Sequence, residues 1–273
     1  ELHSRLEHIC SKYSDFLSKD EIKFILHKPN KGYRVCTLYF LPKLHKTPVV
    51  GRPICSYNGF VFENTSIWLH HKLYPILLRQ QQHLEDSLSL IRDLENLLLP
   101  TNILLFTFDV ESLYPSIPTP EGLRALRRMI EGHFPLGELN LIMALASLTL
   151  HQHYLTFNGG CWQQKRGTAM GSNFAVVYAC LFLCFVENMQ ESRIELRFFK
   201  RYIDDALGFW HGNKKDLVHF LDSYAIGMKE HIKITSCVSK TDVVFLDLHI
   251  FKDVDLDISH KLSSRCHQIS SVS

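Results

Sequence analysis

Two adjacent aspartates, Asp204 and Asp205, lie in the middle of an apolar and aromatic run that extends from Leu196 to Trp210. Carboxylates in such surroundings are costly unless they are paired with a cation or hold a metal ion. The flanking residues, rich in Phe, Tyr, Ile and Trp, predict two short strands with the aspartates at the turn between them. Such a turn is either a solvated hairpin tip or a mount for divalent cations, and the pair alone does not decide between the two.

A third aspartate follows a separate apolar segment. Residues 104–108 predict a buried strand that ends at Asp109, and the prolines beyond it interrupt the strand before a helix with Thr119 as its N-cap. Asp109 and Asp204 are far apart in sequence, so they meet only if the fold brings them together. Two such oxygen sites suit Mg²⁺, which takes few carboxylates and fills its shell with water and substrate phosphate. The implied chemistry is nucleotidyl transfer by two metal ions.

Both acidic segments resemble conserved blocks of reverse transcriptases. Residues 108–115 (Phe-Asp-Val-Glu-Ser-Leu-Tyr-Pro) are similar to motif A of that family, and residues 202–205 (Tyr-Ile-Asp-Asp) are similar to motif C. The particular order of residues in these blocks resembles that in the Penelope-like retroelements, whose enzymes are relatives of telomerase.

Further blocks match the same family in the same order. Residues 41–46 and 52–54 resemble motifs 1 and 2, residues 164–172 (Gln-Lys-Arg-Gly-Thr-Ala-Met-Gly-Ser) resemble motif B, and residues 245–248 resemble the block that follows the palm motifs. The resemblance therefore covers most of the chain.

The resemblance implies an α+β fold, that of the fingers and palm of a right-hand polymerase, with an antiparallel palm sheet packed on helices. The implied organisation is a helical extension over 1–36, one interleaved fingers-and-palm domain over 37–252 and an atypical tail over 253–273. The tail does not resemble a thumb and contains no endonuclease block, so we expect the thumb to be missing.

The resemblance also implies the catalytic residues. Asp109, Asp204 and Asp205 are the implied metal ligands, and Val110 offers a backbone carbonyl to the same ions, Mg²⁺ or Mn²⁺. Asp205, as the second of the pair, either binds metal or tunes the site. We expect the carboxylates of Asp109 and Asp204 to lie within about 3–6 Å of each other, close enough to share two cations.

Two basic residues resemble the fingers side chains that hold the incoming triphosphate. They are Lys43 and Arg52, expected on adjacent strands, with Lys46 as the alternative to Lys43. The run from Lys28 to Arg52 contains six Lys and Arg and no acid, which indicates either a solvated basic face or a phosphate-binding surface.

Three more residues have implied roles and open alternatives. Tyr114 stands where reverse transcriptases place an aromatic ring that blocks a ribose 2′-hydroxyl, or else it is a buried ring before a proline. Gly171 lies in a loop whose glycines let the backbone approach a base pair or template closely. Lys240 is either a general acid for the pyrophosphate leaving group or a solvated lysine at a strand end.

Composition agrees with one large globular protein, with 46% hydrophobic residues and a formal net charge of +2. The eight cysteines form no CxxC pair, and the sixteen histidines have no zinc-finger spacing, so neither a zinc site nor an extracellular disulfide framework is expected. The longest apolar run, Phe174 to Val186, has 13 residues and is too short to cross a membrane. The expected location is intracellular, in the nucleus.

The apolar periodicity and the helix-capping and turn residues along the rest of the chain predict alternating helices and strands. Helices are expected over 1–27, 63–80, 86–99, 120–132, 137–150, 172–190 and 214–229, and strands over 33–41, 48–56, 231–238 and 242–252. Asn158-Gly159-Gly160 predicts a hairpin turn between strands over 153–157 and 161–165.

The expected function is that of an RNA-directed DNA polymerase, a reverse transcriptase from a retroelement, with an RNA template, a DNA primer and deoxynucleoside triphosphates as partners and no membrane. One alternative is a truncated, inactive relic or nucleic-acid-binding domain. Another is an RNA-directed RNA polymerase, against which Tyr114 argues.

Overall fold

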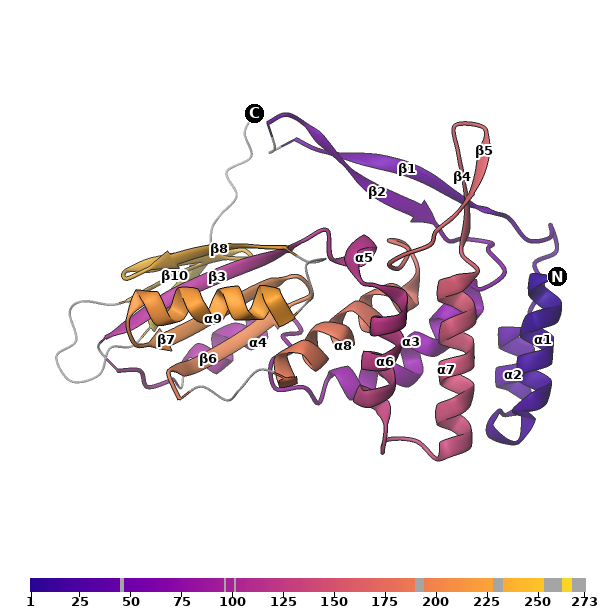
Figure 1. Ribbon diagram of the computed structural model, residues 1–273, viewed down its shortest axis with the longest axis horizontal. Helices are drawn as coiled ribbons and strands as arrows, with labels where there is room; N and C mark the ends of the chain where they lie inside the picture. Colours follow the sequence, from indigo (N-terminus) through magenta and orange to yellow (C-terminus); the bar gives the residue numbers. More distant parts are fainter. Residues whose placement is uncertain are drawn as a thin grey trace. The chain divides into compact units, whose positions relative to one another are not determined.

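The computed structural model describes residues 1–44, 47–95, 97–100, 102–189, 194–227, 233–252 and 262–266, with only the backbone for 225–227 and 262–266. The chain forms two compact units (Figure 1). Unit 1 comprises Glu1–Leu77 and Tyr114–Phe185, and unit 2 comprises Leu78–Leu113 and Val186–Ser273. Each unit is therefore built from two segments that are separated in sequence.

Unit 1 is mainly helical with one small sheet. Its elements are α1 (Leu2–Lys12), α2 (Lys19–Ile25), β1 (Cys36–Lys43), β2 (Val50–Ser56), α3 (Glu63–Leu77), α6 (Thr119–Ile130), α7 (Leu136–His151), β4 (Tyr154–Phe157), β5 (Gly160–Gln163) and most of α8 (Asn173–Met189). The sheet has the strand order β2-β1-β4-β5, and β1 is parallel to β4. The strand pair β1–β2 and the 158–160 hairpin turn agree with the sequence prediction.

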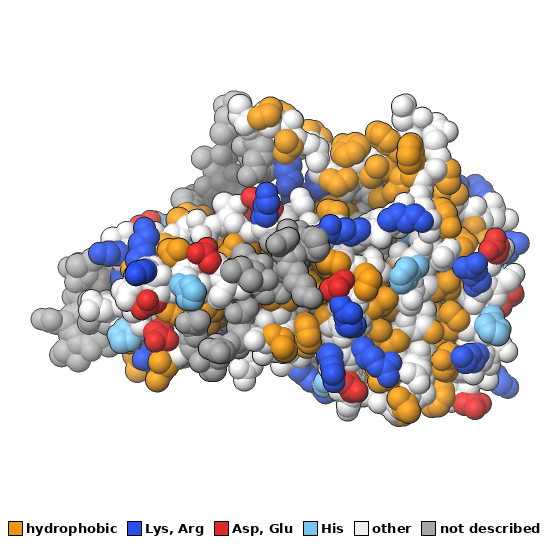
Figure 2. Space-filling view, in the orientation of Figure 1, with side chains coloured by type: hydrophobic (Ala, Val, Ile, Leu, Met, Phe, Trp, Pro, Cys, Tyr) orange, Lys and Arg blue, Asp and Glu red, His pale blue; other side chains and the backbone are white. Residues whose placement is uncertain are grey.

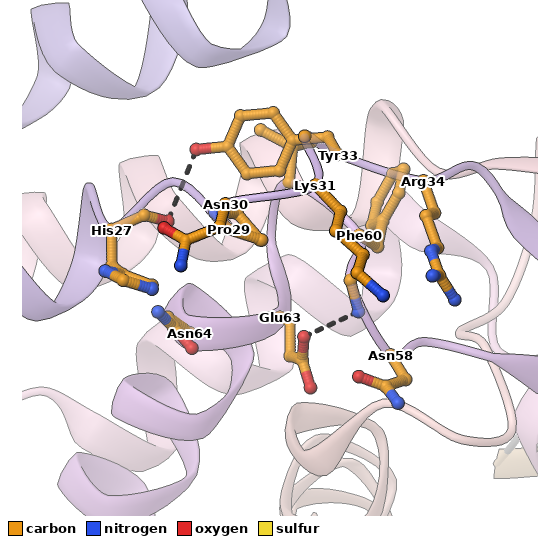
Figure 3. A pocket seen from close by; sticks show the side chains of 13 residues that line it. His27, Pro29, Asn30, Lys31, Tyr33, Arg34, Asn58, Phe60, Glu63 and Asn64 are labelled. Atoms are coloured by element: carbon orange, nitrogen blue, oxygen red, sulfur yellow. Dashed lines mark hydrogen bonds between the residues drawn. The ribbon is translucent and has the colours of Figure 1, made fainter.

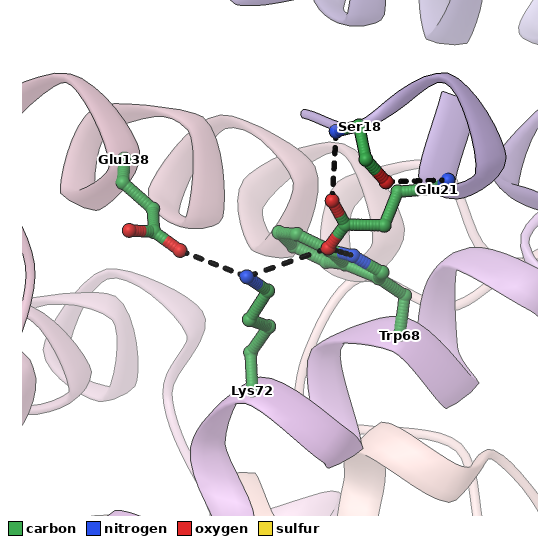
Figure 4. A network of polar contacts seen from close by, with 5 residues as sticks. All are labelled: Ser18, Glu21, Trp68, Lys72 and Glu138. Carbon is green, nitrogen blue, oxygen red and sulfur yellow. Dashed lines mark hydrogen bonds and ion pairs between the residues drawn. The ribbon is translucent and has the colours of Figure 1, made fainter. Parts of the chain in front are cut away.

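A polar network joins three helices of unit 1 (Figure 4). Ser18 and Glu21 form a capping box at the start of α2, and Glu21 also accepts a hydrogen bond of 2.9 Å from the Trp68 indole. Lys72 bridges Glu21 at 3.4 Å and Glu138 at 2.9 Å. Burial alone would raise the pKa of Glu21, but these hydrogen bonds and the Lys72 charge outweigh it and lower that pKa to about 2. The network ties the N-terminal helices to α3 and α7.

Unit 2 is built on an antiparallel sheet with the strand order β6-β7-β3-β8. The strands are β3 (Ile103–Glu111), β6 (Leu196–Tyr202), β7 (Asp205–His211) and β8 (Lys233–Ser239), accompanied by α4 (Ser87–Glu95) and α9 (Lys214–Gly227). A second sheet has the order β11-β10-β9 and consists of β9 (Asp242–Phe245), β10 (Leu248–Lys252) and β11 (Leu262–Cys266).

Alternation along β3 explains how both faces of the central sheet are covered. One face is covered by α9 (Figure 1), where Phe106 and Phe108 pack against Phe220 and Tyr224 of that helix. On the other face, Leu105 joins an apolar cluster supplied by β7, α4 and the second sheet. The predicted α+β class, with antiparallel sheets packed on helices, is therefore confirmed.

Several predicted boundaries are wrong. Thr119 is the first residue of α6 and is buried, and Pro118 occupies the N-cap, so the helix begins one residue earlier than predicted. The strand predicted over 242–252 is two strands, β9 and β10, divided by a turn at Leu246. The helix predicted over 86–99 ends at Glu95. The predicted tail over 253–273 lies outside the described residues except for the backbone of β11.

The cysteines whose side chains the structure describes are free thiols. Cys180 and Cys184 are buried core residues, while Cys161 and Cys237 are exposed. Burial raises the pKa of the Cys10 thiol to about 11. None of the helices within the described ranges is long and apolar enough to cross a membrane.

Candidate catalytic centre

The fold of unit 2 brings the three predicted aspartates to one end of its central sheet. In the antiparallel pairing of β3 with β7, Asp109 lies directly opposite Asp205, so both side chains project from the same face. Asp204 occupies the turn between β6 and β7, and its carbonyl accepts a 3.1 Å hydrogen bond from the backbone N–H of Val110. The turn predicted for the aspartate pair is confirmed, whereas β3 continues two residues beyond Asp109, to Glu111, because it also pairs with β8.

Electrostatics shows that the three carboxylates are crowded. Partial burial, which is the largest cause, and the negative charges of Asp204 and Asp109 together raise the pKa of Asp205 from 3.8 to about 6. A divalent cation would relieve this repulsion, and carboxylate oxygens are the ligands that Mg²⁺ prefers. In the described ranges no group of three or more His, Cys, Asp or Glu side chains is placed so that it could hold a metal ion. A cation bound by the aspartates would need water or substrate phosphate as its other ligands.

A buried arginine fixes the turn that carries Asp204. Arg201 is 0% exposed, and its guanidinium donates to both carboxylate oxygens of Glu187 at 2.5 and 3.1 Å and to the carbonyl of Ile203 at 2.7 Å. Tyr224 donates to the same carboxylate at 2.8 Å. Ile203 has a φ of +54°, which a β-branched residue rarely adopts, so the turn needs such support.

The hydrogen-bond network of Arg201 was not predicted, although the sequence contains a signal for it. Arg201 stands in the same apolar run as the aspartates, and a buried guanidinium requires an acidic partner. The partner, Glu187, directly follows the long apolar run that forms α8. The sequence thus indicates a buried ion pair, but which acid pairs with Arg201 depends on how α8 packs.

The two predicted triphosphate-binding residues lie in unit 1, on adjacent strands as predicted. Lys43 pairs with Val50 and Arg52 pairs with Leu41, which places the two basic side chains diagonally on one face of the β1–β2 hairpin. Arg52 is exposed and Lys43 is half-buried. Lys46, the alternative to Lys43, lies outside the described residues.

The β1–β2 hairpin exposes apolar as well as basic side chains. Tyr39, Phe40 and Leu41 are each about half exposed, at 45%, 50% and 48%. Figure 2 shows hydrophobic side chains gathered over β1, β2 and β4. A surface that combines aromatic and basic groups suits single-stranded nucleic acid, whose bases stack and whose phosphates are anionic.

Tyr114 and the predicted glycine loop form one backbone network in unit 1. Tyr114 is half-buried in the short helix α5 (Leu113–Ser116), and its carbonyl accepts a 2.9 Å hydrogen bond from the N–H of Thr168. A Cβ on Gly167 would collide with the backbone of Tyr114, and one on Gly171 would collide with the carbonyl of Cys55. These glycines permit close approach to the protein's own backbone, and the contact of Gly171 with substrate stays a prediction.

The structure does not bring Lys240 to the aspartates. Lys240 follows Ser239, which pairs with Leu105 at the far end of β3 from Asp109. Four residues of strand, roughly 14 Å at about 3.4 Å per residue, separate these two positions. β8 runs antiparallel to β3 and carries its C-terminal end away from the carboxylates, so Lys240 lies apart from them along the sheet, and its role as a general acid stays a prediction.

Comparison with known proteins identifies the fold. No protein-family model matches the chain, and no curated protein matches it in sequence. Solved structures do match. Telomerase from Candida albicans, in complex with a fragment of telomeric RNA, is similar over 96% of this chain and 49% of its own, with a TM-score of 0.63 and 13% identity. Apo telomerase from Candida tropicalis, truncated of its C-terminal domain, is similar over 86% of this chain and 55% of its own, with a TM-score of 0.59 and 12% identity.

Viral polymerases match to the same degree. The RNA-dependent RNA polymerase of a human picobirnavirus is similar over 84% of this chain and 46% of its own, with a TM-score of 0.57 and 13% identity. This chain thus spans about half the length of the telomerases that it matches. At these identities the likeness shows the fold, which is that of a nucleic-acid polymerase.

Proposed function

We propose that this chain is the fingers and palm of an RNA-directed DNA polymerase, the reverse transcriptase of a Penelope-like retroelement. The observation that carries the proposal is the register of β3 on β7, which places Asp109 opposite Asp205 and beside the turn that holds Asp204. The same fold occurs in telomerases and viral RNA polymerases. The sequence of residues 202–205, Tyr-Ile-Asp-Asp, supports the retroelement assignment.

The proposed reaction joins a primer 3′-oxygen to the α-phosphorus of a nucleotide and releases pyrophosphate. Asp109, Asp204 and Asp205, with the carbonyl of Val110, would hold two Mg²⁺ ions, or Mn²⁺ in their place. Such ions, when bound, lower the pKa of the attacking hydroxyl and stabilise the charge on the leaving group. The predicted approach of the Asp109 and Asp204 carboxylates to about 3–6 Å is part of this proposal.

The residues of unit 1 would select and orient the nucleotide. Arg52 would bind the triphosphate through its planar fork of donors, and Lys43 would bind it as a compact charge. Tyr114 would exclude a ribose 2′-hydroxyl by steric contact. The partners would be an RNA template, a DNA primer and deoxynucleoside triphosphates, in the nucleus of the cell.

A second candidate function is RNA-directed RNA polymerization. It is favoured by the structural likeness to viral RNA-dependent RNA polymerases, which equals the likeness to apo telomerase within a few hundredths of a TM-score. It makes the opposite demand on Tyr114, which would then have to admit a ribose.

A primer-extension assay separates these functions. The full chain would be supplied with a homopolymer RNA template, a complementary primer, Mg²⁺ or Mn²⁺, and either deoxyribonucleotides or ribonucleotides. Extension with deoxyribonucleotides that disappears in Asp109→Asn supports the reverse transcriptase. Preference for ribonucleotides supports the RNA polymerase, and the absence of extension with either metal indicates the inactive relic.

A further inference from the structure

Unit 1 contains a cavity that the proposed polymerase reaction does not use. Its volume is about 390 Å³, within the range of small-molecule sites. Most residues of the segments 27–34 and 58–64 line it, but Lys28 and Phe62 do not (Figure 3). Another hollow of unit 1, beside Tyr57, holds about 10 Å³ and is too small for any ligand.

One wall of the cavity is basic. Lys31 and Arg34 are exposed and extend from the 29–34 segment toward Asn58 (Figure 3). Within the described part of the chain, neither side chain forms an ion pair. The stem of Arg34 packs beside Gly59, whose carbonyl accepts a 2.8 Å hydrogen bond from the Arg34 backbone N–H. Two cations held at the mouth of one cavity suit a phosphate group.

The opposite wall contains a carboxylate and a neutral amide, which form hydrogen bonds. One oxygen of Glu63 accepts a 2.7 Å hydrogen bond from the N–H of Gly59, which orients the carboxylate in the cavity. The amide of Asn58 points into the same space (Figure 3). A carboxylate and an amide side by side can accept from, and donate to, the polar edge of a nucleobase.

Two aromatic residues also line the cavity. Phe60 is buried, and Tyr33 is half-buried with its hydroxyl hydrogen-bonded to Nδ1 of His3 at 2.9 Å. Rings held in place by packing and hydrogen bonds give a flat apolar surface on which a base can lie.

From this arrangement we infer that the cavity binds a nucleoside monophosphate unit, with its phosphate at Lys31 and Arg34 and its base edge at Asn58 and Glu63. A bare inorganic anion would meet the repulsion of Glu63, and a cation would meet that of Lys31 and Arg34. A ligand with an anionic end and a flat end bearing donors satisfies both walls. Because Glu63 accepts hydrogen bonds, bases with an amino group, such as cytosine, bind more tightly than uracil.

The nucleotide has two sources with the same chemistry, free mononucleotide or one residue of a single-stranded RNA. The experiment is isothermal titration calorimetry of the full chain in EDTA, where divalent cations are absent from the proposed catalytic centre. The probes are CMP, UMP, inorganic phosphate and a single-stranded oligocytidylate. Equal affinity for CMP and for the oligonucleotide identifies free nucleotide as the ligand, and much tighter binding of the oligonucleotide identifies RNA.

Charge reversal tests the basic wall. Lys31→Glu and Arg34→Glu should each weaken the binding of CMP or oligonucleotide about tenfold or more, because each removes a charge-assisted phosphate contact. Lys28→Glu is the matched control, since Lys28 is exposed in the same segment but does not line the cavity, and it should change affinity by less than about threefold. Thermal unfolding of each variant confirms that the exposed substitutions leave the fold intact.

Glu63→Gln tests the base wall, because it keeps an oxygen for the Gly59 N–H and removes the negative charge. It should reduce the preference for CMP over UMP, about tenfold in the parent chain, to near unity. The proposal is overturned if no probe binds, if inorganic phosphate binds as tightly as CMP, or if Lys28→Glu weakens binding as much as Arg34→Glu. Since catalysis is not measured, these outcomes do not depend on polymerase activity.

Discussion

Two hairpins of unit 2 turn in the same way but place their aspartates in different surroundings. In the β6–β7 hairpin the turn residues are Ile203 and Asp204, and in the β9–β10 hairpin they are Leu246 and Asp247. The first turn residue has a φ of +54° in one and +53° in the other, a conformation that usually requires glycine. A branched or bulky residue followed by aspartate is therefore held in the same unusual conformation twice.

The difference lies in what faces each aspartate. Asp247 is exposed and accepts a hydrogen bond from the hydroxyl of Ser87 at the start of α4. Asp204 is half-buried, its turn is anchored by Arg201, and its neighbours include Asp205 and Asp109. The same turn geometry thus holds an exposed aspartate bonded to a helix serine in one place and an aspartate of a crowded acidic centre in the other. The third strand, β3, makes the distinction.

The largest expected difference between the two turns is in activity. Asp204→Asn should lower kcat/KM for primer extension by about 10³ or more, because a neutral amide is a poor ligand for a cation worth several kcal/mol to the transition state. Asp247→Asn is the matched substitution in the other turn and should change kcat/KM by less than about threefold. Steady-state kinetics on the homopolymer template measures both, and equal losses would remove the distinction between the turns.

The next largest effect concerns the anchor of the first turn. Arg201→Met leaves Glu187 buried without its partner and should lower the free energy of unfolding by about 3–5 kcal/mol. The neighbouring Lys200→Met breaks a more exposed pair with Asp93, 2.9 Å apart, and should cost less than about 1 kcal/mol.

Two further measurements on Arg201 separate positioning from bulk stability. Arg201→Met combined with Glu187→Met should recover part of the lost stability, because no unpaired charge remains. It should not restore kcat, since the carbonyl of Ile203 still lacks its donor. Full recovery of kcat in the double variant would show that Arg201 stabilises the fold without positioning the turn.

The pH dependence of stability should have opposite signs at the starts of β7 and β9. The folded-state pKa of Asp205 is raised from 3.8 to about 6, so its protonated form favours folding and that contribution is lost as pH rises through about 6. In EDTA at pH 7, Asp205→Asn should therefore raise the free energy of unfolding by about 1–2 kcal/mol, a value reduced for partial exposure.

Asp242 provides the comparison for this titration. Hydrogen bonds from His249 and Thr241 lower its pKa below 3.8, so its contribution is present above that value and is lost as pH falls. Asp242→Asn should flatten the acid side of the stability profile, whereas Asp205→Asn flattens the region between about pH 4 and 6. Urea unfolding across this range checks both, and the same sign for the two variants would contradict the assignment.

The smallest expected effect concerns the strained turn residues themselves. Ile203→Gly should stabilise the protein by up to about 1 kcal/mol, because glycine adopts a positive φ without strain. Leu246→Gly relieves the same strain but loses packing against the apolar cluster of unit 2, so it should come out less stable than Ile203→Gly. The midpoints of urea unfolding rank the two, and the reverse order would show that packing at Ile203 outweighs its strain.

Much of the centre was predictable from local patterns, and the rest depended on strand direction and packing. The aromatic and β-branched flanks of Asp204 predicted its hairpin, and the apolar run before Asp109 predicted β3. The opposition of Asp109 and Asp205 needed the antiparallel register, which sequence separation does not encode. The place of Lys240 on the sheet was not predictable for the same reason, because its separation from Asp205 carried no information on the direction of β8.

Capping and burial show a similar limit. Ser18 and Glu21 form a capping box at the start of α2, and both partners of such a box are local in sequence. Thr119 had an equally good local signal, but the structure buries it inside α6 and leaves Pro118 at the N-cap. Arg201 required a partner that only the packing of α8 supplies.

The distribution of thiols gives the protein a built-in pair of labelling positions. Among the cysteines whose side chains the structure describes, Cys161 of unit 1 and Cys237 of unit 2 are exposed, and the others are buried with their thiols shielded. Cys237 lies on β8 two residues from Thr235, the strand partner of Asp109. Spin or fluorescent labels on these two native thiols would therefore place one reporter in each unit, with the label of unit 2 beside the acidic centre.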